Sequence, residues 1–177
     1  MRKIYIVGTS HQNVTLAYKK ELLELFDEIN PDQVFIEKLK TELSQKRFRD
    51  DRPEMKIAYE WSLKNNKLVN AYDHKQSIIR SGIETPEIDK ANTQLTKITK
   101  KIGWKDLNSL KNILVLKKVL ATILDEDKFN QREQRMLQNI NKAILSNGRI
   151  LILCGTLHVP FFKSKFKEGI LLNQLLK

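Results

Sequence analysis

Short runs of consecutive apolar residues recur along the chain and predict four buried β-strands. The runs cover residues 3–7, 33–37, 67–71 and 149–154, and the third is the weakest of them. Three are rich in Ile, Val or Leu without polar alternation, a pattern typical of parallel strands that helices cover on both faces. The sequence therefore predicts a parallel sheet between helices.

Helical periodicity fills the segments between the first three runs. The apolar residues of 15–29 fall largely on one helical face, and Pro31 closes that segment. Residues 53–65 form a second such segment, which begins at Pro53. Strands and helices thus alternate in the first half of the chain, which implies right-handed crossovers and parallel pairing.

The second half of the chain is mainly helical before its last strand. Residues 84–127 contain no strand candidate and predict two or three lysine-rich helices, with a break at Gly103-Trp104 and a new start at Asp106. Further helices are predicted over 131–145 and 163–176.

We expect one α/β domain over residues 1–177. Its mainly parallel central sheet would be flanked by helices, with a helical insertion at about 84–127 before the last strand.

Composition and cysteine usage indicate a folded chain in a reducing compartment. Hydrophobic residues make up 41% of the sequence, and Cys154 is the single cysteine. Its place in an apolar run favours a small core residue over a nucleophile. We expect no signal peptide and no membrane-spanning stretch, and therefore a cytoplasmic protein. A homo-oligomer is left open.

The net charge of +11 raises the question of nucleic acid. The lysines are spread along helical faces, and no zinc-ligand spacing or aromatic RNA-binding strand accompanies them. We therefore favour a solvated, lysine-rich surface over nucleic-acid binding. Binding to anions or to an acidic membrane surface stays open as a secondary property.

A polar side chain capable of chemistry ends or follows each predicted strand: His11, Glu37, Asp73 and His158. Ligands bind at the carboxyl ends of parallel strands, which meet at one edge of the sheet. The tetrad Gly-Thr-x-His follows two of the strands in a chain with only three histidines. Each residue alone has a structural alternative, such as a solvent-facing Glu37 or a turn-forming Asp73. Together they predict one polar site.

Two imidazoles with one or two carboxylates suit a divalent transition metal such as manganese, cobalt, zinc or iron. Such an ion would lower the pKa of a bound water and polarise a carbonyl. Without a metal, Glu37 or a histidine would serve as general base. The chain has no His-x-x-His spacing, so its local sequence does not decide between a metal site and a metal-free general base. His74 is a spare candidate that we expect to be an exposed loop residue.

Six short motifs follow one another along the chain and together resemble a known family. They are Gly8-Thr9-Ser10-His11, Pro31-Asp32-Gln33-Val34-Phe35-Ile36-Glu37, Glu54 in Arg-Pro-Glu-Met, Tyr72-Asp73, Arg132-Glu133-Gln134-Arg135-Met136 and Gly155-Thr156-Leu157-His158. In this order they resemble the TraB/PrgY/GumN family. That family is related to Tiki metalloproteases and more distantly to erythromycin-esterase-like and ChaN-like proteins.

The chain also departs from the family pattern. Lys38-Leu39-Lys40 follows Glu37 in place of an arginine-containing continuation, and Cys154 precedes the second glycine where a valine-like residue is usual. The hydrophobic tail of some TraB proteins is missing, so we expect a minimal version of the fold without membrane association.

The resemblance implies a mixed α/β fold and a metal-dependent hydrolase, peptidase- or esterase-like, that acts on a peptide or small molecule. By the same resemblance, His11 and His158 would be metal ligands or acid–base groups. Glu37 and Glu54 would be ligand or general base, and Asp73 would orient a histidine.

Arg132 would, by this resemblance, stabilise an oxyanion or hold the acidic groups in place. An arginine at a predicted helix start is electrostatically misplaced unless it pairs with carboxylates, which strengthens this expectation. Glu54 in a helix's first turn and Glu133, in capping-box spacing with Asn130, have structural alternatives.

Two other classes of function stay open. The pocket could belong to a non-catalytic ligand- or partner-binding module that docks an acidic partner through the basic middle segment. Such binding should weaken steeply with salt. A nucleic-acid-processing enzyme is the weaker alternative, because Asp50-Asp51 substitutes poorly for a clustered acidic metal site.

Overall fold

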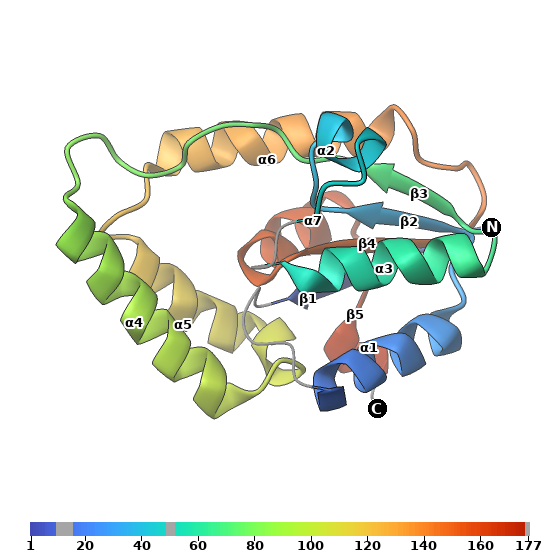
Figure 1. Cartoon of the computed structure of the whole chain (residues 1–177), viewed down its shortest axis with the longest axis horizontal. Helices are drawn as coiled ribbons and strands as arrows, with labels where there is room; N and C mark the ends of the chain where they lie inside the picture. Colours follow the sequence, from blue (N-terminus) through green and yellow to red (C-terminus); the bar gives the residue numbers. More distant parts are fainter. Residues whose placement is uncertain (10–15, 49–51, 176–177) are drawn as a thin grey trace.

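Five parallel strands form one sheet at the centre of the protein (Figure 1). The computed structural model describes residues 1–9, 16–48 and 52–175, with the backbone alone for residues 16 and 17. The strands run in the order β3-β2-β4-β1-β5. Their bounds are β1 (Arg2–Thr9), β2 (Gln33–Ile36), β3 (Leu68–Ala71), β4 (Gly148–Gly155) and β5 (Ile170–Leu171). The predicted α/β fold with a parallel sheet is confirmed.

Helices cover both faces of the sheet, which explains the continuous apolar runs. α1 (Leu16–Ile29) and α3 (Pro53–Lys64) pack on one face, and α6 (Glu126–Asn141) and α7 (Val159–Lys165) on the other. Successive side chains of a strand point to opposite faces. In β4, Leu151 and Leu153 accordingly join the first cluster, while Ile150 and Ile152 join the second.

The predicted helical insertion lies between β3 and β4. It consists of α4 (Thr85–Ile102), the short 3₁₀ helix η1 (Asp106–Asn108) and α5 (Leu110–Leu120). Gly103 ends α4 with a φ of 79°, a conformation that glycine adopts without strain. Figure 1 shows α4 and α5 beyond the carboxyl ends of the strands, at the edge where the site was expected.

One buried amide fixes this insertion to the sheet. Asn108 Oδ1 accepts the Gly8 N–H at 2.6 Å, and its Nδ2 donates to the Gly8 carbonyl at 3.0 Å. Gly8 must be a glycine for this contact, because a Cβ there would lie 2.7 Å from Val159 Cγ2 and 3.0 Å from Asn108 Oδ1. The insertion therefore docks at the end of β1.

Two helix predictions were wrong. The segment 163–176 is not one helix, because the chain leaves α7 to add β5 and ends in the short α8 (Leu172–Leu175). The helix predicted over 131–145 begins at Glu126 instead, where Asp125 caps it by accepting the Lys128 N–H at 3.1 Å. A short helix that we did not predict, α2 (Lys40–Ser44), follows β2.

No helix of the described part of the chain combines the length and the apolarity that a membrane span requires.

Candidate functional site

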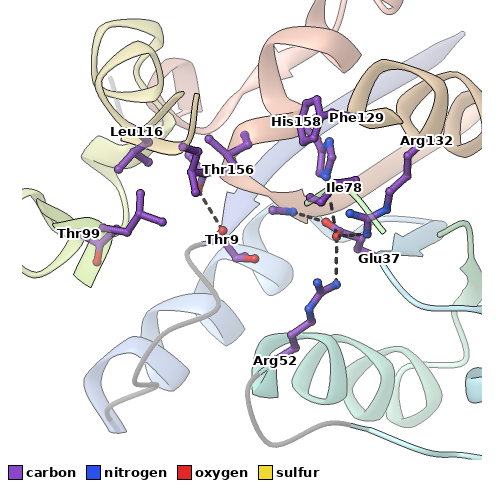
Figure 2. Close-up of a pocket in the computed structure, with 14 residues that line it drawn as sticks. Thr9, Glu37, Arg52, Ile78, Thr99, Leu116, Phe129, Arg132, Thr156 and His158 are labelled. Atoms are coloured by element: carbon purple, nitrogen blue, oxygen red, sulfur yellow. Dashed lines mark hydrogen bonds and ion pairs between the residues drawn. The ribbon is translucent and has the colours of Figure 1, made fainter. Parts of the chain in front are cut away.

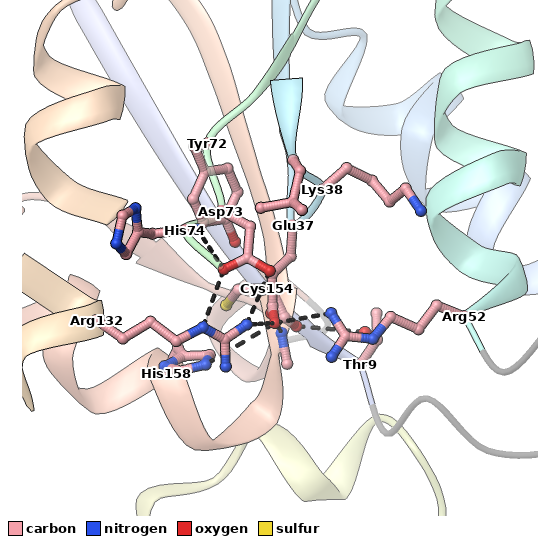
Figure 3. Close-up of polar contacts among 12 residues, drawn as sticks. Thr9, Glu37, Lys38, Arg52, Tyr72, Asp73, His74, Arg132, Cys154 and His158 are labelled. Atoms are coloured by element: carbon pink, nitrogen blue, oxygen red, sulfur yellow. Dashed lines mark hydrogen bonds and ion pairs between the residues drawn. The ribbon is translucent and has the colours of Figure 1, made fainter. Parts of the chain in front are cut away.

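Buried opposite charges meet where β2 and β3 end. Glu37 follows β2 and is 1% exposed. Its Oε1 accepts from Arg132 Nη2 at 3.1 Å and from Arg52 Nη1 at 3.0 Å. Arg132 also holds Asp73 through two bonds, from Nε at 3.0 Å and from Nη2 at 2.8 Å. Figure 3 shows the resulting row from Asp73 through Arg132 and Glu37 to Arg52.

Backbone geometry adds a third donor to Glu37. β2 and β4 are neighbours in the sheet, so the residue after β2 lies beside the end of β4. There the Gly155 N–H donates to Glu37 Oε2 at 2.5 Å. Burial alone would lower the pKa of the Arg132 guanidinium, but Asp73 and Glu37 raise it above its usual range. The buried carboxylates are thus matched by a cation that stays charged.

His158 forms a second polar unit with Glu133. The imidazole is 4% exposed, and its Nδ1 lies 2.8 Å from Glu133 Oε1. The ring stacks on Phe129 at 4.9 Å between centroids and 8° between planes. The carboxylate of Glu133 thus holds the Nδ1 edge of the ring, and Nε2 is the nitrogen on the opposite edge. Nε2 faces Glu37 Oε1 at 3.9 Å (Figure 2).

Two threonine hydroxyls link the ends of β1 and β4. Thr156 Oγ1 donates to the Thr9 carbonyl at 3.0 Å. Thr9 Oγ1 lies 3.1 Å from Glu54 Oε1 and 3.3 Å from the Cys154 carbonyl. Glu54 is fully buried at the start of α3. It therefore belongs to the β1 side of the site and not to the row around Arg132.

Of the four strand-end residues, the structure brings Glu37, Asp73 and His158 together, and Arg132 of α6 joins them. His11 lies outside the described residues, so its predicted place beside His158 stays a prediction. The His74 side chain points away from Arg132 and Glu37 (Figure 3).

The partners of Asp73 and Glu133 differ from those expected. Glu133 lies in the interior of α6 and holds His158, so its predicted capping role was wrong. Asp73, which we expected beside a histidine, binds Arg132 instead. Arg132 lies in the second turn of α6, not at its start, because the helix begins earlier than predicted. Its pairing with carboxylates was nevertheless expected.

Two cavities share Glu37, Arg52, Ile78 and Arg132 as their common wall. The apolar cavity, of about 190 Å³, lies between the strand ends and the insertion, with His158 on its wall. The polar cavity, of about 400 Å³, lies on the other side, along the segment that follows Asp73. Of these two cavities, His158 lines only the apolar one.

The cysteine next to the site is no nucleophile. Cys154 is fully buried, and burial raises the pKa of its thiol well above the usual range, with further contributions from the Glu37 and Glu133 charges. A thiol in this state carries no thiolate at neutral pH. The predicted core role of Cys154 is consistent with its packing in the second hydrophobic cluster.

The described residues fit a divalent metal poorly. A cation on Glu37 Oε1 would lie beside two guanidinium groups that already bind this oxygen. Within the described ranges, no group of three or more His, Cys, Asp or Glu side chains is placed to hold a metal ion. His11, the second imidazole, falls outside these ranges, so the metal site stays a prediction.

The fold and the site define an open parallel α/β protein with a buried ion-pair row and a carboxylate-held histidine at its strand ends. No family model matches the chain, and no curated protein or solved structure matches it. The resemblance to TraB-type hydrolases therefore stays an expectation.

Proposed function

We propose that the protein hydrolyses an ester or an amide, with His158 as the general base. The carrying observation is the contact between Glu133 and His158 Nδ1, with His158 on the wall of the apolar cavity. In the proposed reaction Nε2 is the basic nitrogen. A buried carboxylate that fixes the tautomer of a histidine is the arrangement that general-base catalysis requires.

Water is the nucleophile in this proposal. The Thr9 and Thr156 hydroxyls are engaged with neighbouring groups, and the Cys154 thiol is buried and protonated. His158 Nε2 takes a proton from the water as its oxygen adds to the carbonyl carbon. The same proton then passes to the departing oxygen or nitrogen as the bond to the carbonyl carbon breaks.

Arg52 and Arg132 supply positive charge for the oxyanion of the intermediate. Each guanidinium has five N–H donors. Arg52 donates from Nη1 to Glu37. Arg132 donates from Nε to Asp73 and from Nη2 to both Glu37 and Asp73. Both arginines line the cavity together with His158. In the proposed reaction their remaining N–H groups face the oxyanion, and fixed donors of this kind typically contribute about 10²–10³-fold in rate.

The test measures hydrolysis of 4-nitrophenyl esters and acyl amino acids by protein purified without chelator or histidine tag. We expect His158→Gln and Glu133→Gln to lose about 10²–10⁴-fold in kcat, the usual contribution of general-base catalysis. Glu126→Gln, an exposed carboxylate of the same helix as Glu133, is the matched control. Unchanged kcat in His158→Gln would refute the proposal.

Metal analysis of the same preparation separates the two water-activation schemes. Activity that survives chelation supports His158 as the base. Activity that requires manganese, cobalt, zinc or iron, lost together with the metal in His11→Ala, would replace this scheme with the metal-dependent one.

A ligand- or partner-binding module is the second candidate. Seven lysines and a single acidic residue, Asp106, fall within residues 97–118 of the insertion. Docking of an acidic partner there would weaken steeply between 50 and 200 mM salt, by the counterion release that accompanies each neutralised phosphate or carboxylate. Salt-sensitive binding to a polyanion without any hydrolysis would favour this candidate.

A further inference from the structure

The two cavities that meet at Arg132, Glu37 and Arg52 differ in character. Leu95 of α4 and Leu116 and Leu120 of α5 line the apolar cavity on the side of the insertion. The polar cavity is lined instead by the segment 74–77, with the sequence His-Lys-Gln-Ser. A molecule that crosses the shared wall would have an apolar part and a polar part on opposite sides.

The polar cavity has one positive charge in excess. Each of its three carboxylates already has a cationic partner: Glu37 and Asp73 bind arginine, and Glu42 lies 3.3 Å from Lys38 Nζ. Lys75 lines the same cavity and has no carboxylate partner among the described residues. The cavity thus favours a group with negative charge.

We propose, resting on the hydrolase function above, that the substrate joins a short aliphatic acyl group to an anionic leaving group. The acyl chain occupies the apolar cavity, the scissile carbonyl lies at the shared wall near His158, and a carboxylate or phosphate on the leaving group faces Lys75. Water adds to the carbonyl carbon and the bond to the leaving nitrogen or oxygen breaks. A short carboxylic acid and an anionic amine or alcohol are released.

Cavity size sets the length of the acyl group. The apolar cavity of about 190 Å³ is smaller than the ~300–1,000 Å³ of pockets that enclose drug-sized ligands. It suits a chain of a few methylenes better than a long fatty acyl chain or a folded peptide.

Matched substrates test each half of the proposal. N-hexanoylglycine and N-hexanoylglycinamide differ in the carboxylate, and N-acetylglycine differs from the first in acyl length. We expect kcat/KM for N-hexanoylglycine to exceed that for each comparison substrate by about tenfold or more, the discrimination typical of a few pocket contacts. N-hexanoyl-phosphoethanolamine replaces the carboxylate by a phosphate and shows which anion is preferred.

Variants assign each preference to its cavity. Lys75→Gln should reduce the preference for the charged substrate severalfold, and Leu95→Trp should reduce the preference for hexanoyl over acetyl. Lys118→Gln and Leu114→Trp, on the exposed side of α5, are the controls for charge and for bulk. If Lys118→Gln and Leu114→Trp changed the substrate preferences as much as Lys75→Gln and Leu95→Trp, the assignment of the two substrate parts to the two cavities would be wrong.

The outcomes separate this proposal from the general one. Hydrolysis of simple esters with no preference among the matched substrates would overturn the substrate class and leave the hydrolase function standing. If no substrate is hydrolysed, calorimetric binding of N-hexanoylglycine with the same charge and length preferences would retain the cavity assignment without catalysis. If the protein neither hydrolyses nor binds these substrates, the hydrolase function and the substrate class are both refuted.

Discussion

Arg132 is the residue on which the buried charges of the site depend. It is 7% exposed and bonds to both Glu37 and Asp73, which come from the ends of two strands. Removal of one partner of a buried ion pair leaves an uncompensated charge, which is far more costly than the net value of the pair itself.

Arg132→Met should therefore lower the free energy of unfolding by about 3–5 kcal/mol. Arg135→Met, an exposed arginine of the same helix, should change it by no more than about 0.5 kcal/mol. Urea unfolding measures both. The added substitutions Glu37→Gln and Asp73→Asn should recover part of the loss, because they remove the unmatched charges. Equal losses in Arg132→Met and Arg135→Met would contradict this account.

Some of the residues at the site could be predicted from the sequence. Glu37 ends an apolar run, and Asp73 and His158 come two and four residues after theirs. Parallel topology brings such positions to one edge of the sheet. Arg52 was not singled out as a site residue, because nothing in its local sequence shows that it reaches back to Glu37. Glu133 was misread because Asn130 mimics a helix cap, whereas the actual cap is Asp125.

At the scale of elements, the insertion and the sheet meet through Asn108. This side chain satisfies both the N–H and the carbonyl of Gly8, one residue before Thr9. Without Asn108, two buried backbone groups would lose their partners, at a cost of about 1–3 kcal/mol each.

Asn108→Ala should accordingly destabilise the fold by about 2–4 kcal/mol, if partial relaxation around Gly8 is allowed for. It should also speed amide hydrogen exchange in α4 and α5 relative to β4, because the insertion would detach before the sheet opens. Asn112→Ala is the control, since its amide bonds to the Asp106 carbonyl at an exposed position. Uniform acceleration of exchange in the insertion and the sheet would show that Asn108 stabilises the whole fold instead.

The elements that were predicted correctly are those with a strong local signal. Three of the four predicted strands have near-continuous apolar runs, and α1 and α3 have an apolar face together with a proline near one end. β5 contains only two residues and forms because β1 offers it an edge, so no local pattern marks it. The contact between Asn108 and Gly8 joins residues 100 positions apart, so no local pattern of apolar and polar residues predicts it.

At the scale of the whole molecule, the positive charge is less concentrated than the sequence first suggests. Acidic residues lie near both ends of the insertion, including Glu84, Glu87, Asp125 and Glu126, so the lysine excess of this region is confined to residues 97–118. The overall charge of +11 therefore favours weak attraction of anions over a broad surface more than a single nucleic-acid site.

Global stability should fall at alkaline pH because three buried acids, Cys154, Tyr72 and Tyr18, resist ionisation, Tyr18 through its burial and the charge of Glu54. Burial raises the pKa of Tyr72 well above its usual range, as do the charges of Cys154 and Glu37, and burial likewise raises that of Cys154. The unfolded chain would release these protons near pH ~8.5 for the thiol and ~10 for the phenols. The folded chain retains them, so the unfolded state binds fewer protons and stability decreases as pH rises.

Each such group should remove about 1.4 kcal/mol per pH unit above its unfolded pKa, until the folded group also ionises. Urea unfolding of the parent between pH 7 and 11 should show a slope that starts near pH ~8.5 and steepens near ~10. Cys154→Ala should remove the first step, and Tyr72→Phe should reduce the second, to which Tyr18 also contributes. Tyr72→Phe also loses the hydrogen bond to the Leu153 carbonyl at 3.0 Å. Its free energy of unfolding at pH 7 should therefore drop by about 1 kcal/mol, while the slope of its stability at alkaline pH flattens.

A parent protein whose stability is constant up to pH 10 would mean that the thiol ionises equally readily in the folded and the unfolded chain. Cys154 would then be accessible to solvent, and its exclusion as a nucleophile would no longer hold.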